Sequence, residues 1–199
     1  MRVVEIFKSI QGEGANTGRL ATFVRLAGCN LNCWYCDTEW RHGIDMSLEE
    51  ITRRVEALGC RFLIWTGGEP TLQLTEEVVA HFKALGYTQA IETNGTITPP
   101  KGIDYISCSP KVGLEVLRKT FANRTIGELR YPYGAEIETP PAIEELPPAE
   151  HYFVSPIFLG KERVREEYRP EHLALCLDFI EKDPRWRLSL QVHKLINVP

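Results

Sequence analysis

Three cysteines lie close together in the chain, where Cys29, Cys33 and Cys36 are separated by three and by two residues. Clustered thiolates in a chain without a secretory signature favour a metal centre over a disulfide framework. A structural zinc site would need a fourth ligand, and a thioredoxin-like pair would have to open a helix. Three thiolates instead suit a [4Fe–4S] cluster that leaves one iron open. The scattered cysteines are expected to be small buried hydrophobes: Cys60, Cys108 and Cys176.

Further polar motifs follow runs that look like β-strands. The sequence TGGEP at residues 66–70 follows one such run, ETNG at 92–95 ends the next, and SPK at 109–111 ends the one after. Taken alone, Gly67 and Gly68 could simply form a turn, without a role in binding. Barrel and open α/β folds, however, hold their ligands at the carboxyl ends of parallel strands. The three motifs are therefore expected to meet around one site.

Short apolar runs that alternate with helical patterns predict a sheet built from βαβ units. The strand-like runs cover residues 3–7, 20–26, 62–66, 90–93, 105–108, 129–133, 152–155 and 188–192. Two connections, 94–104 and the proline-rich 140–148, lack a full helical pattern. We therefore expect an α/β fold: an open, partial β/α (TIM-like) barrel of about six parallel strands with trimmed helices, in a single domain spanning residues 1–199.

Three helices are predicted from caps and apolar spacing. Ser47 and Glu50 form a capping box, and Thr75 caps a second helix. A third helix runs from about residue 171 to 181, before an Asp-Pro stop. The residues expected to face inward on these helices are Leu48, Ile51, Val55, Leu58, Val78, Phe82, Leu85, Leu173, Leu177 and Ile180.

Composition and charge limit the possible partners. The 199 residues carry a formal net charge of −4 and no block of like charges, which argues against a nucleic-acid binder. There is no apolar run of about 18 residues that would span a membrane, and the N-terminus lacks the apolar region of a signal peptide. We expect a cytoplasmic protein that acts on a small molecule.

The cysteine motif, with Tyr35 before its last cysteine, resembles the signature of the radical S-adenosylmethionine (SAM) superfamily, and TGGEP resembles that superfamily's GGEP motif. The resemblance implies that the open iron binds the amino and carboxylate groups of SAM. The superfamily commonly has a Gln-Pro pair near the SAM adenine, at the end of a later strand. At the corresponding strand end this chain has SPIF (155–158), so Ser155 stands in the place of the glutamine. The SAM contacts implied by the resemblance are Tyr35, Gly68, Asn94, Ser109, Pro110, Lys111 and Ser155.

Within that superfamily the chain closely resembles the 7-carboxy-7-deazaguanine synthases, in the segments IFKSIQGEG (6–14), NTGR (16–19), FVRLAGC (23–29), CDT (36–38) and SLQVHK (189–194) and in the final proline. The implied reaction converts 6-carboxy-5,6,7,8-tetrahydropterin to 7-carboxy-7-deazaguanine with loss of ammonia, on the path to queuosine and other 7-deazapurines. The implied cofactors are a [4Fe–4S] cluster, SAM and Mg²⁺. The resemblance also implies a homodimer and an electron donor such as flavodoxin or ferredoxin.

Residue roles follow from the same resemblance. Thr38 matches the residue that binds Mg²⁺, although a turn hydroxyl is the ordinary alternative. The implied substrate contacts are Ile10, Gln11, Gly12, Glu13, Arg25, Thr66, His193 and Pro199. Arg25 lies in an apolar strand and would receive the substrate carboxylate, or else pair internally with Glu5. The paired N–H donors of the pterin would meet a carboxylate, either that of Pro199 or that of Glu13. For Pro199, the C-terminus would fold back over the site after a strand that carries His193. The alternative is that the C-terminus is a frayed tail.

Two other functions share part of this pattern. A glycyl-radical enzyme activase, acting on a protein partner, would share the cysteine motif and the small size, but would not need the QGE loop at 11–13 or the CDT motif at 36–38. A non-enzymatic iron–sulfur carrier would leave the polar strand ends without a role. Both are therefore disfavoured.

Overall fold

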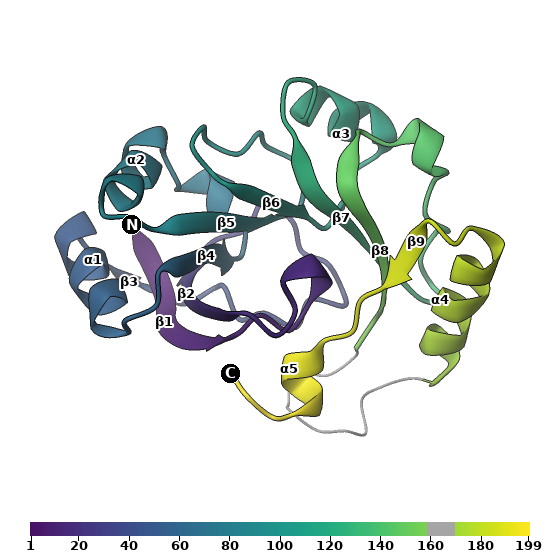
Figure 1. Cartoon of the computed structure of the whole chain (residues 1–199), viewed down its shortest axis with the longest axis horizontal. Coiled ribbons are helices and arrows are strands. Elements are labelled where there is room, and N and C mark those ends of the chain that lie inside the picture. Colours follow the sequence, from purple (N-terminus) through teal and green to yellow (C-terminus); the bar gives the residue numbers. More distant parts are fainter. Residues whose placement is uncertain (159–169) are drawn as a thin grey trace.

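A computed structural model describes residues 1–158 and 170–199 of the chain (Figure 1). Its strands are β1 (Arg2–Ile10), β2 (Leu20–Leu26), β3 (Ile44–Asp45), β4 (Phe62–Gly67), β5 (Thr88–Thr93), β6 (Tyr105–Cys108), β7 (Ile126–Tyr133), β8 (Ala149–Pro156) and β9 (Trp186–Leu188). Its α-helices are α1 (Leu48–Ala57), α2 (Glu76–Ala84), α3 (Leu114–Thr120), α4 (Pro170–Lys182) and α5 (Val192–Leu195). Short 3₁₀ turns lie at Gly14–Asn16 (η1), Pro70–Leu72 (η2) and Ile143–Glu145 (η3).

The strands form one curved sheet in the order β3-β1-β2-β4-β5-β6-β7-β8-β9. From β2 to β9 every neighbouring pair is parallel, which confirms the expected open β/α arrangement. The first strand differs from a simple barrel strand because β1 pairs with β2 and β3 in antiparallel fashion. Within the described residues β3 and β9 are free edges, so the sheet does not close.

Helices α1 to α4 cover the outer side of the sheet, whereas α5 lies at its open side (Figure 1). The predicted caps are present: Ser47 accepts from the backbone N–H of Glu50, and Thr75 accepts from that of Val78. No α-helix joins β5 to β6 or β7 to β8, as expected. Helix α3 was not predicted. None of the described helices is long and apolar enough to cross a membrane.

The prediction of inward-facing residues was wrong at two positions. Leu85 and Leu177 are 36% and 44% exposed. Helix α2 instead buries Val79 with Phe82, and α4 buries His172 with Cys176. Leu85 is the C-cap of α2, beyond its last helical residue, whereas Leu177 is next to Cys176 and lies off the buried stripe that His172 and Cys176 define. The scattered cysteines Cys60, Cys108 and Cys176 are buried, as expected.

Alternate residues of each strand face opposite sides of the sheet, and this separates two environments. Outward residues such as Val24, Trp65, Ile91 and Leu129 pack in the main core beneath the helices. A smaller inner cluster contains Ala21, Phe23, Cys60, Phe62, Ile64 and Ala90. Further along the same inner face, toward the carboxyl ends of the strands, polar residues replace the apolar ones. This change of side-chain type places the polar site above the inner cluster.

The predicted strand at 188–192 was wrong, because β9 ends at Leu188 and residues 192–195 form α5. Ser189 is the turning point. Its backbone N–H still donates to the carbonyl of Val154, while its hydroxyl accepts from the N–H of Gly14. The chain then turns toward the loop after β1, where Val192 N–H donates to the Gly12 carbonyl. Contacts with a loop from the opposite end of the sequence therefore replace strand pairing.

Candidate active site

A cavity of about 680 Å³ opens at the carboxyl ends of the parallel strands. It is lined by every residue that the sequence predicted for the site except Pro110, which is buried beside it. The lining therefore joins the cysteine loop after β2, the ends of β4, β5, β6 and β8, the loop after β1 and the C-terminal segment. This gathering of distant segments is the main observation about the site.

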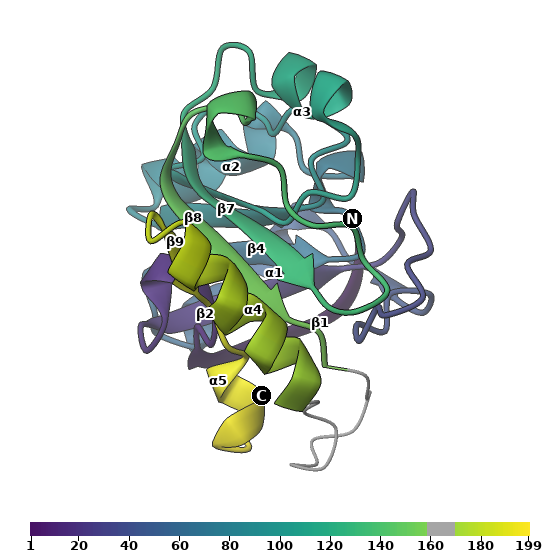
Figure 2. The same ribbon diagram turned by 90° about the vertical axis from the view of Figure 1, so that its right-hand side faces the viewer.

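The cysteine loop joins β2 to β3 and stands away from the strands in Figure 2. Cys29, Cys33 and Cys36 are free, partly exposed thiols on the cavity wall. Among the described residues no three His, Cys, Asp or Glu side chains are placed to hold a single metal ion. A cubane cluster binds each cysteine through a different iron, so its ligands need not converge on one point. The three thiols therefore fit a [4Fe–4S] cluster better than a zinc ion.

The TGGEP motif packs directly against this loop. Gly68 has no space for a side chain, because a Cβ there would overlap the carbonyl of Gly28, just before Cys29. Glu69 N–H donates to the same carbonyl. The Glu69 side chain is fully buried, and its oxygens accept hydrogen bonds from Thr93 Oγ1 at 2.9 Å and from Asn94 N–H at 2.7 Å. Glu69 thus ties the end of β4 to the end of β5 and leaves the Gly68 backbone facing the cavity.

The end of β6 brings a lysine to the cysteines. Lys111 Nζ donates to Ser109 Oγ at 2.7 Å and lies 5.4 Å from the centre of the Tyr35 ring. Burial lowers the pKa of Lys111 to about 8, and burial raises the pKa of Tyr35. Asn94 is joined by its side-chain amide to Asn30 in the cysteine loop. The side of the cavity next to the cysteines is therefore polar and carries the Lys111 amine.

The loop after β1 forms the opposite wall. The imidazole of His193 packs on Gly12, where any Cβ would overlap the ring. His193 lies on α5 and not on a strand as predicted, and burial lowers the pKa of its imidazole. The chain then folds back, so that Ser9 Oγ donates to a main-chain oxygen of Pro199 at 2.6 Å. Gly12, His193 and Pro199 therefore meet as predicted, through a helical turn.

Arg25 combines the two interpretations that the sequence allowed. Its Nε–H donates to Glu5 Oε1 at 2.7 Å, which confirms the internal ion pair. Arg25 also lines the cavity, and the Nε contact uses only one edge of the guanidinium. A carboxylate can still be received on the Nη edge. Arg25 is also less buried than its apolar strand suggested, since its side chain is 23% exposed.

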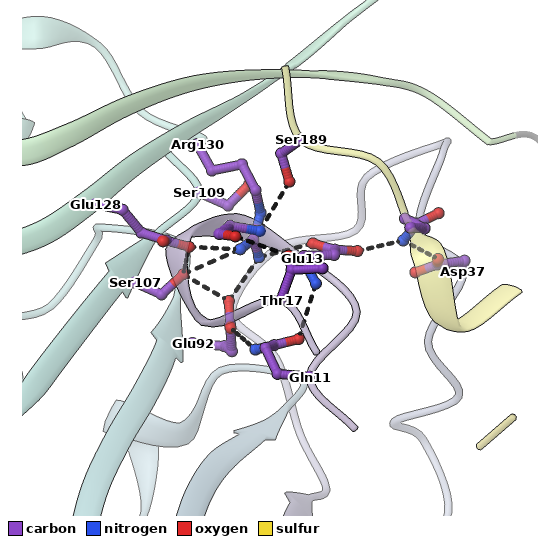
Figure 3. A network of polar contacts seen from close by, with 12 residues as sticks. Gln11, Glu13, Thr17, Asp37, Glu92, Ser107, Ser109, Glu128, Arg130 and Ser189 are labelled. Atoms are coloured by element: carbon purple, nitrogen blue, oxygen red, sulfur yellow. Dashed lines mark hydrogen bonds and ion pairs between the residues drawn. The ribbon is translucent and has the colours of Figure 1, made fainter. Parts of the chain in front are cut away.

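Sequence reasoning missed the charged group at the floor of the cavity (Figure 3). Arg130 on β7 forms ion pairs with three carboxylates: Glu13 at 2.8 Å, Glu92 at 2.6 Å and Glu128 at 2.7 Å. Glu92 Oε1 also accepts from the side-chain amide of Gln11 at 2.8 Å. The signal that singled out Arg25, a charge inside an apolar strand, was present at Arg130 as well and would have found it.

A second polar group joins the C-terminal segment to the cysteine loop. Asp37 accepts from Lys194 Nζ at 2.6 Å and from Gln191 at 3.1 Å, and Gln191 also donates to Glu13. Burial alone would raise the pKa of Asp37, but the Lys194 ammonium and the hydrogen bonds from Lys194 and Gln191 hold it below its ordinary value. The Thr38 hydroxyl, 3.4 Å from Asp37 Oδ1, faces the same cavity.

Comparison with known proteins adds independent evidence. The radical SAM superfamily model matches residues 24–119. The 7-carboxy-7-deazaguanine synthase of Bacteroides thetaiotaomicron is 38% identical over 198 residues, which cover 99% of this chain and 98% of that protein. The synthase of Haemophilus influenzae is 39% identical, with 98% and 93% covered. The crystal structure of QueE from Escherichia coli superposes with a TM-score of 0.72 over 96% of this chain and 94% of that one, at 22% identity, which supports the fold.

The similarity to these relatives runs through both walls of the cavity. It includes the cysteine loop within the superfamily match and also the N- and C-terminal segments outside it. A shared radical SAM core alone would not extend to those segments. The chain therefore belongs to the 7-carboxy-7-deazaguanine synthase family of the radical SAM superfamily.

Proposed function

We propose that this chain converts 6-carboxy-5,6,7,8-tetrahydropterin to 7-carboxy-7-deazaguanine and ammonia, as the names of its relatives suggest. The observation that carries the proposal is the composition of the cavity at the carboxyl ends of the strands. Three free cysteines line one side of it, and the opposite side presents hydrogen-bonding groups together with an arginine. A cofactor and a flat anionic heterocycle can therefore face each other within it.

The cofactor side would hold the [4Fe–4S] cluster on Cys29, Cys33 and Cys36. When bound, the cluster would supply the electron for the reductive cleavage of SAM, and SAM would supply the radical chemistry that takes hydrogen from the pterin. Gly68 and the ends of β5 and β6 offer backbone and side-chain groups to SAM. The proposed SAM contacts are Tyr35, Gly68, Asn94, Ser109, Pro110, Lys111 and Ser155, with Pro110 acting by shaping the turn, since it does not line the cavity.

The substrate side would receive the pterin between the loop after β1 and α5. Arg25 would bind the substrate carboxylate through its Nη edge, while Glu5 holds its Nε edge. Glu13 lies in the cavity as an acceptor for the paired N–H donors of the pyrimidine ring, and its contacts with Arg130 and Gln191 fix its position. The proposed contacts are Ile10, Gln11, Gly12, Glu13, Arg25, Thr66, His193 and Pro199.

Magnesium is a further part of the proposal. Mg²⁺ prefers oxygen ligands and keeps several waters, so one protein hydroxyl together with substrate oxygens is sufficient. Thr38 presents its hydroxyl to the cavity beside Asp37. We expect added Mg²⁺ to raise turnover, and Thr38→Ala to weaken that response without changing SAM cleavage in the absence of pterin. Equal activity in excess chelator would exclude a role for the metal.

The proposed location, oligomeric state and electron donor of the protein rest on its family and on the state of its thiols. All six cysteines are free, as is usual in the reducing cytoplasm. A homodimer and a flavodoxin or ferredoxin as electron donor follow from family resemblance. Light scattering on the purified protein would measure the oligomeric state, and reduction of the cluster by each carrier would identify the donor.

The central experiment uses protein with a reconstituted cluster, SAM, a reductant and the pterin. We expect the deazaguanine to form, which its absorbance would detect, and ammonia to be released. Cys33→Ala should remove the [4Fe–4S] signal and the activity, whereas the matched change Cys60→Ala, at a buried cysteine outside the cavity, should keep both. A complete cluster in Cys33→Ala would refute the assignment of the ligands.

The glycyl-radical activase is not favoured, because the full-length relatives reported above are named as 7-carboxy-7-deazaguanine synthases.

A further inference from the structure

A row of polar side chains leads away from the cavity along the inner face of the sheet. Strand register sets Glu92 of β5 beside Ser107 of β6, and Ser107 beside Glu128 of β7. Ser107 Oγ lies 2.9 Å from Glu92 Oε2 and 2.8 Å from Glu128 Oε1 (Figure 3). Tyr105, two residues earlier on β6, donates its hydroxyl to Glu128 Oε2 at 3.0 Å. Four side chains thus form one continuous hydrogen-bonded chain.

The contacts of Ser107 are best satisfied by a proton on one carboxyl group. The Ser107 hydroxyl has a single hydrogen, yet it makes contacts of hydrogen-bond length with two carboxyl oxygens. Arg130 also donates to Ser107 Oγ. That contact gives the Ser107 oxygen a donor, but it adds no second hydrogen between Ser107 and the two carboxyl groups. A proton on Glu92 or Glu128 that is donated to Ser107 satisfies both contacts. The charges support a protonated carboxyl group as well. One guanidinium pairs with three carboxyl groups, so a proton on one of them reduces the excess of negative charge.

Glu92 is the better site for that proton. Besides Ser107, Glu128 has three hydrogen-bond donors, namely the Ala15 N–H, Tyr105 and Arg130, whereas Glu92 has two, Gln11 and Arg130. The smaller set of donors on Glu92 leaves it the better group to donate to Ser107. Burial raises the pKa of Glu92, the nearby charges of Glu128 and Glu13 add to the shift, and Arg130 opposes it. A proton on Glu92 would let Glu92 donate to Ser107 and Ser107 donate to Glu128.

The other end of the chain reaches a second cavity. Tyr105 lines a space of about 310 Å³ near the amino ends of β6 and β7, which is lined also by Gly127 and Glu150. Any Cβ at residue 127 would overlap the Tyr105 ring, so this glycine makes room for it. Burial raises the pKa of Tyr105, as do the charges of Glu128 and Glu150. The phenol therefore stays protonated and can act as a donor.

We propose that Glu92, Ser107, Glu128 and Tyr105 form a proton relay that connects the active-site cavity with water in the second cavity. Only Glu92 lines the active-site cavity, and only Tyr105 lines the second one. Ser107 and Glu128 are 3% and 2% exposed and line neither, so they carry the connection through the interior. The relay rests on the proposed function for the use of its proton.

The loss of ammonia supplies that use. The C–N bond breaks with its electron pair leaving on nitrogen, and the nitrogen takes a proton from Glu92 and departs as ammonia. The neighbouring carbon releases a proton to water as its C–H electron pair forms the ring double bond. Tyr105 then takes a proton from water as it passes its own to Glu128 Oε2. The Glu128 carboxyl group turns to present that proton to Ser107, and Ser107 passes its own proton to Glu92. Substrate therefore gives product and ammonia with no net change in protons.

The first test detects the proton itself, without turnover. Infrared spectra of the resting protein should contain the carbonyl stretch of a protonated carboxyl group, which disappears in Glu92→Gln and shifts in Ser107→Ala. Exchange of solvent into D₂O should move the same band. The absence of a band that depends on Glu92 would overturn the relay, whatever the activity of the protein.

The second test measures proton delivery in the loaded enzyme. Ser107→Ala and Tyr105→Phe should lower kcat about tenfold or more and increase the solvent deuterium isotope effect, with the KM for the pterin and SAM cleavage without pterin unchanged. Tyr152→Phe is the matched control, because its hydroxyl bonds only backbone groups at the start of β8. Ser107→Thr, which keeps a hydroxyl, should recover part of the rate.

The two proposals can fail separately. If the wild-type protein makes the deazaguanine but Ser107→Ala and Tyr105→Phe match it in kcat and isotope effect, the relay is wrong and the function stands. If the wild-type protein makes none, the proposed function is wrong, and the infrared band still decides whether Glu92 carries the proton.

Discussion

Glu69 allows a quantitative test of how the strand ends are held around the cavity. One of its carboxylate oxygens accepts from the Thr71 N–H, the Thr71 hydroxyl and the Thr93 hydroxyl, and the other accepts from the Asn94 N–H. The change Glu69→Gln keeps the size of the side chain but replaces one oxygen with an NH₂ group. In the less costly orientation, this NH₂ faces the Asn94 N–H, so that two donors oppose each other.

The expected loss follows from these contacts. A buried donor without an acceptor costs about 1–3 kcal/mol, and the three remaining bonds lose the strength that a charged acceptor adds. Removing a buried charge recovers part of that loss. We expect the free energy of unfolding to fall by about 2 kcal/mol, which a domain with about 5–15 kcal/mol survives. Weaker SAM binding should accompany it, because Asn94 is displaced at the end of β5.

Urea unfolding of the apoprotein measures the first effect, and equilibrium binding of SAM to the protein with its cluster measures the second. Glu50→Gln is the matched control, since Glu50 forms an exposed pair with Arg54 and should change stability by less than about 0.5 kcal/mol. Iron content should stay unchanged in both variants. If Glu69→Gln were as stable as the control and bound SAM equally well, the carboxylate would not join the two strand ends.

Three further changes probe the substrate side. Gly12→Ala should displace His193 and α5 and weaken pterin binding by on the order of tenfold, as measured by titration of the protein with the pterin, because a single methyl group overlaps the ring. Glu5→Gln keeps an acceptor for Arg25 but removes a competing charge that is half exposed, so the KM for the pterin should fall about two- to fivefold. Glu92 holds its proton above the ordinary carboxyl pKa in the folded state. Wild-type stability should therefore fall relative to Glu92→Gln as the pH rises above the ordinary carboxyl range toward the raised pKa of Glu92, as followed by urea unfolding.

Controls and contrary outcomes are available for each change. Gly113→Ala is a matched control for the first, because a Cβ there meets no atom within 4 Å; equal pterin binding by Gly12→Ala would mean that α5 does not form the wall. An unchanged KM in Glu5→Gln would show that Arg25 does not meet the substrate carboxylate. A stability difference that stays constant with pH would contradict a proton on Glu92.

The sequence was most informative where chemistry needs a fixed spacing along the chain. The spacing of Cys29, Cys33 and Cys36 is local, so it predicted a metal loop without knowledge of the fold. The strand-end motifs were also readable, because the carboxyl ends of parallel strands meet at one edge of the sheet. The same logic failed at 188–192, where apolar residues suggested a strand but contacts with Gly12 and Gly14 turn the chain into α5.

The sequence by itself therefore determined the family, the open α/β sheet and a set of site residues that, apart from Pro110, all line the cavity. Only the tertiary structure revealed that Arg130 joins carboxylates from three elements and that Ser107 lies between Glu92 and Glu128. The physical reason is that a local pattern records the face of a strand but not its register against its neighbours. Register decides which buried charges meet, and hence where a proton must be held.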